Sequence, residues 1–195
     1  MTEIQQVITT LHDQFTLKVL GFVMSCFLGF EVHRSNESIT LTQQNYARDL
    51  LTTTQLLDSK PQRTLMCSTS ESFPKIDTPM QNPTMYRGVI GALQYFTMTR
   101  PDITFHMNRL SLFMQSLTFN HWSACKHVLR YLAGTFDMGL TFNVAYSLNL
   151  QGFIDADWAG CYDDRKSTSG YCIFICGNLI SWCSKKQTVI ARSSL

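Results

Sequence analysis

The stretch Tyr86-Arg-Gly-Val-Ile-Gly-Ala-Leu-Gln-Tyr95 decides how the middle of the chain folds. Its apolar residues recur every three or four positions, as in a helix with one buried side. These residues are Val89, Ile90, Leu93 and Phe96, which fall on other sides of the helix than Arg87, Gly91 and Tyr95. Thr84 can cap this helix, which we expect to run to about Met98. Further apolar repeats predict a helix from Ile103 to Leu117 and another from a cap at Asn120 to a stop at Gly134.

A different side of the first helix carries residues suited to nucleic acid. Arg87, Gly91 and Tyr95 follow one another at intervals of four, so they share a face. A small residue between a cation and an aromatic ring lets a helix approach a duplex closely, with Arg87 on phosphate and Tyr95 against sugar or base. The alternative interpretation is a helix with ordinary surface residues, and the pattern leaves both open.

The flanking sequence predicts short helices and strands. Upstream we expect a helix to about Phe15, a hairpin formed by 22–33 and 39–43, a helix over 46–57 and a proline-containing connector over 58–83. Downstream we expect strands over 140–143, 149–158, 168–176 and 179–188, with the last turn at Gly177-Asn178. The last three strands would form an antiparallel sheet with an uncovered face.

Composition excludes several classes of protein. With 45% hydrophobic and 15% charged residues among 195, the chain is globular rather than disordered. Its net charge of +2 attracts polyanions weakly, so nucleic-acid binding needs a local patch. The apolar run 19–30 is shorter than the roughly 20 residues of a membrane span and lies too late for a secretory signal. Seven cysteines without a Cys-x-x-Cys pair predict buried thiols, and hence an intracellular protein that is not secreted.

Two carboxylates follow an apolar strand start. Asp155 and Asp157 come directly after Phe153-Ile154, and Asp163-Asp164 follow a few residues later. Carboxylates at a strand end can ligate Mg²⁺. An Asp-x-Asp pair is also common in solvated turns, so the pattern alone supports either interpretation.

Longer sequence motifs contain the candidate helix and the carboxylates. Asp155-Ala-Asp-Trp-Ala-Gly160 and Asn178-Leu-Ile-Ser-Trp-Cys-Ser-Lys-Lys-Gln187 closely resemble the ribonuclease H segment of copia-type LTR retrotransposon Pol polyproteins. The stretch 86–95, Thr99-Arg-Pro-Asp-Ile103 and Val128-Leu-Arg-Tyr-Leu-Ala-Gly-Thr135 are similar to the end of the same family's reverse transcriptase. The resemblance covers nearly the whole chain in family order.

The resemblance implies two nucleic-acid-binding elements. The helix over 84–98 would be the thumb helix that follows the minor groove of the primer-template, and the residues around Leu28 would belong to the hairpin that grips the primer end. The candidate nucleic-acid-binding residues are therefore Phe27, Leu28, Gly29, Arg87, Gly91, Gln94 and Tyr95. The implied partner is RNA-DNA hybrid or DNA, bound weakly, and neither a membrane nor a small-molecule substrate is expected.

The resemblance also implies which catalytic groups are needed. The family's polymerase motif, Tyr-x-Asp-Asp, would precede the first helix expected here, and Tyr162-Asp-Asp164 has a different spacing. Asp155 matches the first of about four nuclease carboxylates that hold two Mg²⁺ ions. The family's next ligand, a Glu, would follow Arg192-Ser-Ser194, which is where this sequence stops. We therefore expect Asp155 to be a remnant metal ligand, no cofactor to be bound, and neither polymerase nor nuclease activity.

The expected fold class is α+β, with four parts. They are a palm remnant with the hairpin at 1–57, the connector at 58–83, a helical thumb-like region at 84–143 and the truncated start of a ribonuclease H-like domain at 144–195. Three hypotheses about function follow, namely an inactive fragment of a transposable element, a module that binds RNA-DNA hybrid, and a Mg²⁺-dependent nuclease completed by another chain.

Overall fold

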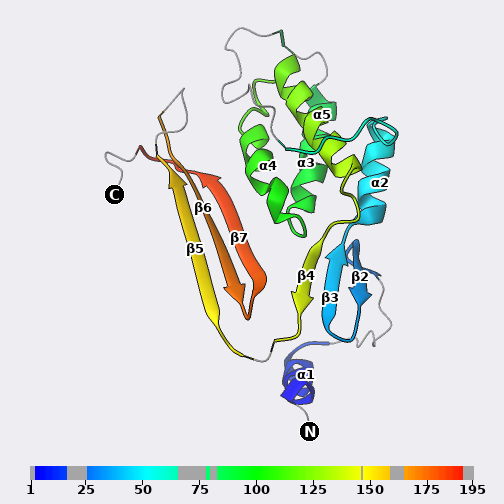
Figure 1. Cartoon of the computed structure of the whole chain (residues 1–195), viewed down its shortest axis with the longest axis vertical. Coiled ribbons are helices and arrows are strands. Elements are labelled where there is room, and N and C mark those ends of the chain that lie inside the picture. The colour runs from blue at the N-terminus through cyan, green and yellow to red at the C-terminus, as the bar shows by residue number, and fades with distance from the viewer. Residues whose placement is uncertain are drawn as a thin grey trace.

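The computed structural model describes residues 3–16, 26–65, 78–79, 83–145, 147–158 and 165–190. Its architecture is α+β, as the sequence predicts. A group of helices carries a four-stranded and a three-stranded antiparallel sheet, and both sheets extend from this group (Figure 1).

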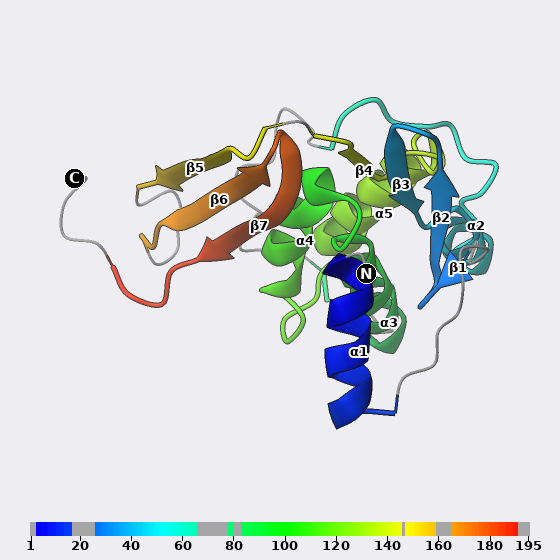
Figure 2. The ribbon, with the colours of Figure 1, turned by 90° about the horizontal axis from the view of Figure 1, so that it is seen from below.

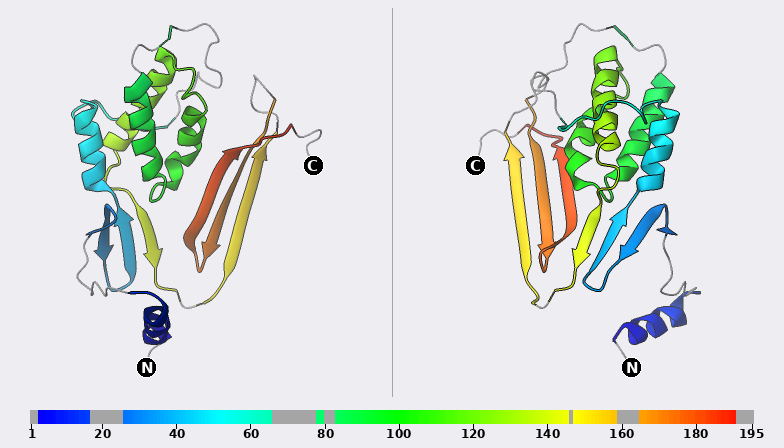
Figure 3. Two further views of the ribbon diagram at one scale, coloured as in Figure 1. Left: turned by 180° about the vertical axis from the view of Figure 1, so that it is seen from behind. Right: turned by 45° about the vertical axis from the view of Figure 1, so that its right-hand side comes forward.

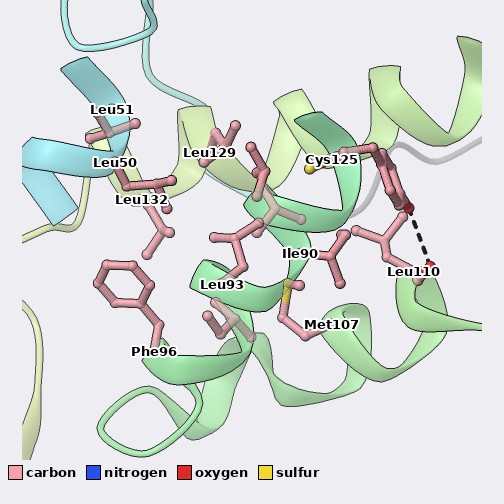
Figure 4. Packing of buried hydrophobic residues seen from close by; sticks show 14 of the residues in the cluster. Leu50, Leu51, Ile90, Leu93, Phe96, Met107, Leu110, Cys125, Leu129 and Leu132 are labelled. Carbon is pink, nitrogen blue, oxygen red and sulfur yellow. Dashed lines mark hydrogen bonds between the residues drawn. The ribbon is translucent and has the colours of Figure 1, made fainter. Parts of the chain in front are cut away.

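The hydrophobic core is built by four helices and a short 3-10 turn. These are α2 (Gln44–Thr53), α3 (Pro83–Phe96), η1 (Pro101–Ile103), α4 (Thr104–Ser111) and α5 (Phe119–Ala133). The apolar side of α3 lies at the centre, where Ile90 and Leu93 are 0% exposed (Figure 4). Burial of each such side chain stabilises the fold by about 1.5–3 kcal/mol. Because Leu51 of α2 packs in the same cluster, the segments before and after the connector share one core.

The first sheet joins the N-terminal hairpin to the end of the helical region. Its strands are β1 (Cys26–Phe27), β2 (Phe30–Arg34), β3 (Ser38–Thr42) and β4 (Leu140–Asn143), in that order. After α5 the chain returns as β4 and pairs with β3, with Thr40 opposite Thr141 and their hydroxyl oxygens 3.0 Å apart. This non-local pairing anchors the hairpin beside the helices.

The second sheet contacts the helices through one edge strand. It consists of β5 (Leu150–Asp157), β6 (Thr168–Ile175) and β7 (Asn178–Lys186), in that order. Strand β7 lies beside α4, and the Trp182 indole N–H donates to the Thr97 carbonyl over 3.1 Å (Figure 2). Strand β5 lies farthest from the helices, and every residue along it is exposed, including Ile154 at 85%. The expected uncovered sheet surface is therefore present.

The first helix, α1 (Glu3–Gln14), ends close to where the sequence predicts and lies apart from the core (Figure 3). Its apolar residues Val7 and Leu11 are exposed. No helix among the described residues is long and apolar enough to cross a membrane. The described cysteines are free thiols, but only Cys125 among them is buried, and the prediction of buried thiols is wrong for Cys26, which is exposed. Burial raises the pKa of the Cys125 thiol to about 12, which leaves it an unreactive core residue. Cys67 and Cys161 lie outside the described residues.

Several local predictions are wrong in register or extent. The helix expected over 103–117 ends at Ser111, with turns after it. The last hairpin turns at Cys176-Gly177, both with positive φ, one residue earlier than Gly177-Asn178. Helix α5 is capped by Thr118 rather than Asn120, because the Thr118 hydroxyl accepts from the His121 backbone N–H while the His121 ring accepts from the Thr118 N–H. This reciprocal cap gives His121 a structural role.

Candidate nucleic-acid interface

A tight turn at Leu28-Gly29 interrupts the strand expected over 22–33, of which 22–25 lie outside the described residues. Phe27 pairs with Phe30, and the two residues between them have φ values of 49° and 77°. Two-residue hairpins favour positive φ at both central positions because this backbone twist matches that of the strands. For a leucine this conformation costs about 1–2 kcal/mol. Leu28 is 70% exposed, so the turn presents an apolar side chain to solvent.

The turn is held against α3 by Tyr95. The Tyr95 hydroxyl donates a hydrogen bond to the Leu28 carbonyl oxygen. Its ring stacks on Phe30, with centroids 5.5 Å apart, and meets the edge of Tyr46 at 5.2 Å. Such ring pairs add about 0.5–1.5 kcal/mol each beyond their buried area. The contact joins two elements that the sequence assigns separately to the interface, although Leu28 and Tyr95 are 67 positions apart.

The outer face of α3 continues this surface. Arg87, Gly91 and Gln94 are exposed, and a Cβ added at Gly91 or at Gly88 would meet no atom within 4 Å. The Arg87 Nε donates to the Met114 carbonyl over 3.1 Å, which holds the guanidinium against the segment after α4. From Arg87 to Tyr95 the helix rises about 12 Å. We name this combined area, from the Leu28-Gly29 turn along Tyr95, Gln94 and Gly91 to Arg87, the turn-helix surface.

The structure thus brings the predicted residues together, but it gives Tyr95 a contact that the sequence did not indicate. Tyr95 is half-buried between aromatic rings and bonded to the turn. Phe30 and Tyr46 were missed as parts of this site, since aromatic residues in a strand and a helix look like ordinary core. The backbone of Phe27 lies in β1, and its side chain is outside the described part of the structure.

Two basic residues on α5 that could contact phosphate instead hold the connector. The His127 Nε2 lies 2.8 Å from the Thr64 carbonyl oxygen, and the Arg130 Nε donates to the Lys60 carbonyl over 2.8 Å. Their side chains therefore hydrogen-bond to backbone carbonyl groups of a segment that belongs to no strand or helix.

Asp155 lies on the exposed strand β5. It is distant in sequence from the residues of the turn-helix surface. One of its carboxylate oxygens accepts a hydrogen bond from the Ala156 N–H over 2.9 Å. Across the sheet it faces Gly170 and then Ser184, while Asp157 faces Thr168 and then Lys186. Among the described residues no three His, Cys, Asp or Glu side chains gather as a metal site would require. Asp163 and Asp164 lie outside the described part of the chain.

Known proteins resemble this chain along most of its length. It is 45% identical over 168 residues to the retrovirus-related Pol polyprotein from transposon RE2 of Arabidopsis thaliana, covering 86% of this chain but 12% of that protein. It is 33% identical over 193 residues to the Pol polyprotein from transposon TNT 1-94 of Nicotiana tabacum, covering 94% of this chain and 14% of that protein.

A shorter relative matches almost from end to end. An uncharacterised mitochondrial protein of Arabidopsis thaliana is 38% identical over 196 residues, which cover 99% of this chain and 80% of that protein. No family model and no solved structure matches the chain. The chain therefore spans about an eighth of the Pol polyproteins that it matches, and it belongs to the family of retrovirus-related Pol polyproteins of transposons.

Proposed function

We propose that this chain is the segment of a copia-type Pol polyprotein that joins the end of the reverse transcriptase to the start of the ribonuclease H domain, and that it binds RNA-DNA hybrid. The observation that carries the proposal is the hydrogen bond from Tyr95 to the Leu28 carbonyl, because it makes the hairpin turn and α3 one surface. The resemblance implies a primer grip and a thumb helix for the same two elements.

The chemistry of the turn-helix surface suits a nucleic-acid backbone. Arg87 carries a permanent positive charge and can contact phosphate. Gly88 and Gly91 add no side chain to the exposed face of α3 between Arg87 and Gln94, so a sugar-phosphate strand can approach the helix closely there. The roughly 12 Å rise between Arg87 and Tyr95 corresponds to about three to four nucleotides measured along the axis of a duplex. Leu28, at the opposite end of the turn-helix surface from Arg87, can add an apolar contact to a sugar or a base edge.

Replacing Arg87 by alanine tests this function. The full chain should bind a labelled RNA-DNA hybrid at low salt, and Arg87→Ala should weaken binding by about fivefold to tenfold. The slope of log affinity against log salt concentration should fall by about 1, since one phosphate contact is lost. Fluorescence anisotropy at several salt concentrations measures both quantities.

The matched control is Lys126→Ala, which removes one positive charge from an exposed position on α5. It should leave both affinity and salt slope close to those of the unmodified chain. Equal losses for the two variants would mean that net charge, and not the turn-helix surface, governs binding. Absence of binding at low salt would instead favour the second candidate, an inactive fragment of a transposable element.

We further propose that this chain alone does not cut nucleic acid. Two Mg²⁺ ions need about four carboxylates arranged around them. On the described part of the second sheet the acidic side chains are Asp155 and Asp157, both on the same face of β5, and the residues opposite them are Gly170 and Thr168. These residues do not fit a complete two-metal site, so we derive no cleavage step from them.

Incubation of the same hybrid with the chain and Mg²⁺ tests this second proposal, and the hybrid should stay intact. Gel analysis of the labelled RNA strand gives the readout. Cleavage that disappears in Asp155→Asn would reverse the proposal and would point to ligands supplied by a second chain.

A further inference from the structure

The outer edge of β5 has no strand beside it among the described residues (Figure 1). Strand β5 pairs with β6 from Leu150 to Asp157 without a shift of register, and it forms the outermost strand of the second sheet. Successive residues of an antiparallel strand direct their backbone N–H and C=O groups alternately to its two sides. Half of the residues of β5 therefore direct a donor and an acceptor away from β6.

The hydrogen bonds at β5 identify these residues. The Cys176 N–H donates to the Asn149 carbonyl oxygen over 2.8 Å, so Asn149 directs its backbone groups toward β6. Every second residue after Asn149 does the same. The Ala156 N–H agrees with this alternation, because it donates to the Asp155 carboxylate over 2.9 Å. The residues whose backbone groups point outward are therefore Leu150, Gly152, Ile154 and Ala156.

We propose that this edge pairs as an antiparallel strand with the same edge of a second copy of the chain. A two-fold axis through Phe153, perpendicular to the sheet, places Leu150 opposite Ala156 and Gly152 opposite Ile154. Each outward-facing residue then meets another one, and the two β5 strands form about eight backbone hydrogen bonds. The Ala156 N–H exchanges the carboxylate beside it for the Leu150 carbonyl of the second copy. The second sheets of the two copies thereby become one continuous sheet.

The side chains of β5 favour this axis over its neighbours. An axis through Phe153 places Asp155 opposite Gln151 and sets the two Phe153 rings opposite each other, and such aromatic pairs stabilise sheets. An axis through Ile154 would place Phe153 opposite Asp155. An axis through Asp155 would place two carboxylates opposite each other, which is destabilising. An axis through Gly152 would leave one outward-facing residue of each copy without a partner in β5.

The chemistry of the edge favours a second strand as its occupant. The outward groups of β5 include donors and acceptors, and a strand satisfies both, whereas a nucleic-acid phosphate only accepts hydrogen bonds. Strand β5 contains neither lysine nor proline, which natural proteins use to protect exposed edges. Its Ile154 is exposed and would lie over Gly152 of the second copy, where a Cβ would meet no atom within 4 Å of its own chain. The edge is therefore complementary to itself.

Sedimentation equilibrium of the full chain, from micromolar to millimolar concentration, tests the association. The unmodified chain should show a monomer-dimer equilibrium. Gln151→Asp sets a carboxylate opposite Asp155 twice in each dimer and should weaken it about fivefold, while Gln151→Lys should strengthen it about fivefold. Net charge predicts the opposite order, because Gln151→Asp brings the net charge of +2 closer to zero and so reduces repulsion between copies. A chain that stays monomeric, or a dimer that neither substitution changes in this order, overturns the proposal.

Disulfide formation between two copies tests the register. Phe153→Cys places two thiols opposite each other in a pair whose Cα atoms lie about 4.5 Å apart, which a disulfide can span. Mild oxidation should therefore give a covalent dimer on a non-reducing gel, with mass spectrometry locating the bond between the two 153 positions. Ile154→Cys is the matched control, because its two copies would be diagonal neighbours about 7–8 Å apart. Cross-linking of Ile154→Cys in place of Phe153→Cys would overturn the proposed pairing. Neither experiment contains nucleic acid, so both are independent of hybrid binding.

Discussion

Replacing Gly139 by alanine is expected to lower the free energy of unfolding by about 3 kcal/mol. A Cβ at this position would lie 2.1 Å from the Leu41 carbonyl oxygen and 2.9 Å from the Leu41 carbonyl carbon. Both are backbone atoms of β3 at the point where Leu41 pairs with Leu140 of β4. The strands must separate to admit the methyl group, and that breaks the pairing that ties the end of the helical region to the hairpin. Urea unfolding followed by circular dichroism measures the loss.

Gly91→Ala provides the matched comparison for this prediction. A Cβ at Gly91 meets nothing within 4 Å, and alanine has a higher helix propensity than glycine. This variant should be more stable than the unmodified chain by about 0.5–1 kcal/mol. It should nevertheless bind hybrid more weakly, because the added methyl group lies on the turn-helix surface. Similar stability changes for the two alanine variants would contradict the close approach of β3 and β4.

Replacing Arg100 by methionine is expected to cost about 3 kcal/mol at neutral pH. The Arg100 side chain is 4% exposed and forms a fork on Asp102, with Nε–Oδ1 and NH2–Oδ2 distances of 3.0 and 2.8 Å. It also donates to the carbonyl and hydroxyl oxygens of Thr135, just beyond α5, over 2.7 and 2.9 Å. Methionine would fill part of the space but would leave these acceptors without their donor.

The cost of Arg100→Met should depend on pH. Burial alone would raise the pKa of Asp102, but the hydrogen bonds and charge of Arg100, with a hydrogen bond from Tyr131, outweigh it and lower that pKa. A carboxyl whose pKa is lower in the folded chain stabilises the fold above its unfolded pKa of about 3.9 and loses this contribution as pH falls through the folded value. The variant should therefore differ less from the unmodified chain at pH 2–3 than at pH 7. An equal difference at both pH values would contradict the role assigned to the ion pair.

Local sequence patterns predicted the core helices where apolar repeats coincide with a buried face, as on the side of α3 that carries Ile90 and Leu93. Helix α1 ends near Phe15 as expected, although its apolar residues Val7 and Leu11 are exposed. Gly134 does end α5, but its backbone is not left-handed. A Cβ there would lie 2.9 Å from the Pro61 Cβ, so the glycine allows the connector to approach the helix end.

The turn at Leu28 was hidden because leucine and its neighbours favour extended strand and disfavour positive φ. What holds the turn is Tyr95, a residue remote in sequence, and such a contact leaves no local pattern. For the same reason, the sequence placed Arg87, Gly91 and Tyr95 on one helix face but could not show that the Tyr95 hydroxyl is hydrogen-bonded to the hairpin. Predictions from periodicity identify which residues share a face and do not identify their tertiary partners.

We propose that a hairpin turn and a helix, distant in sequence, form one surface for RNA-DNA hybrid. Titration of the isotope-labelled full chain with hybrid, followed by amide chemical shifts in NMR spectra, tests it most directly. Amides of Leu28 and Gly29 and those from Arg87 to Tyr95 should shift together with one dissociation constant, while those of β5 stay unchanged. Shifts confined to either element alone, or centred on Asp155, would contradict the account.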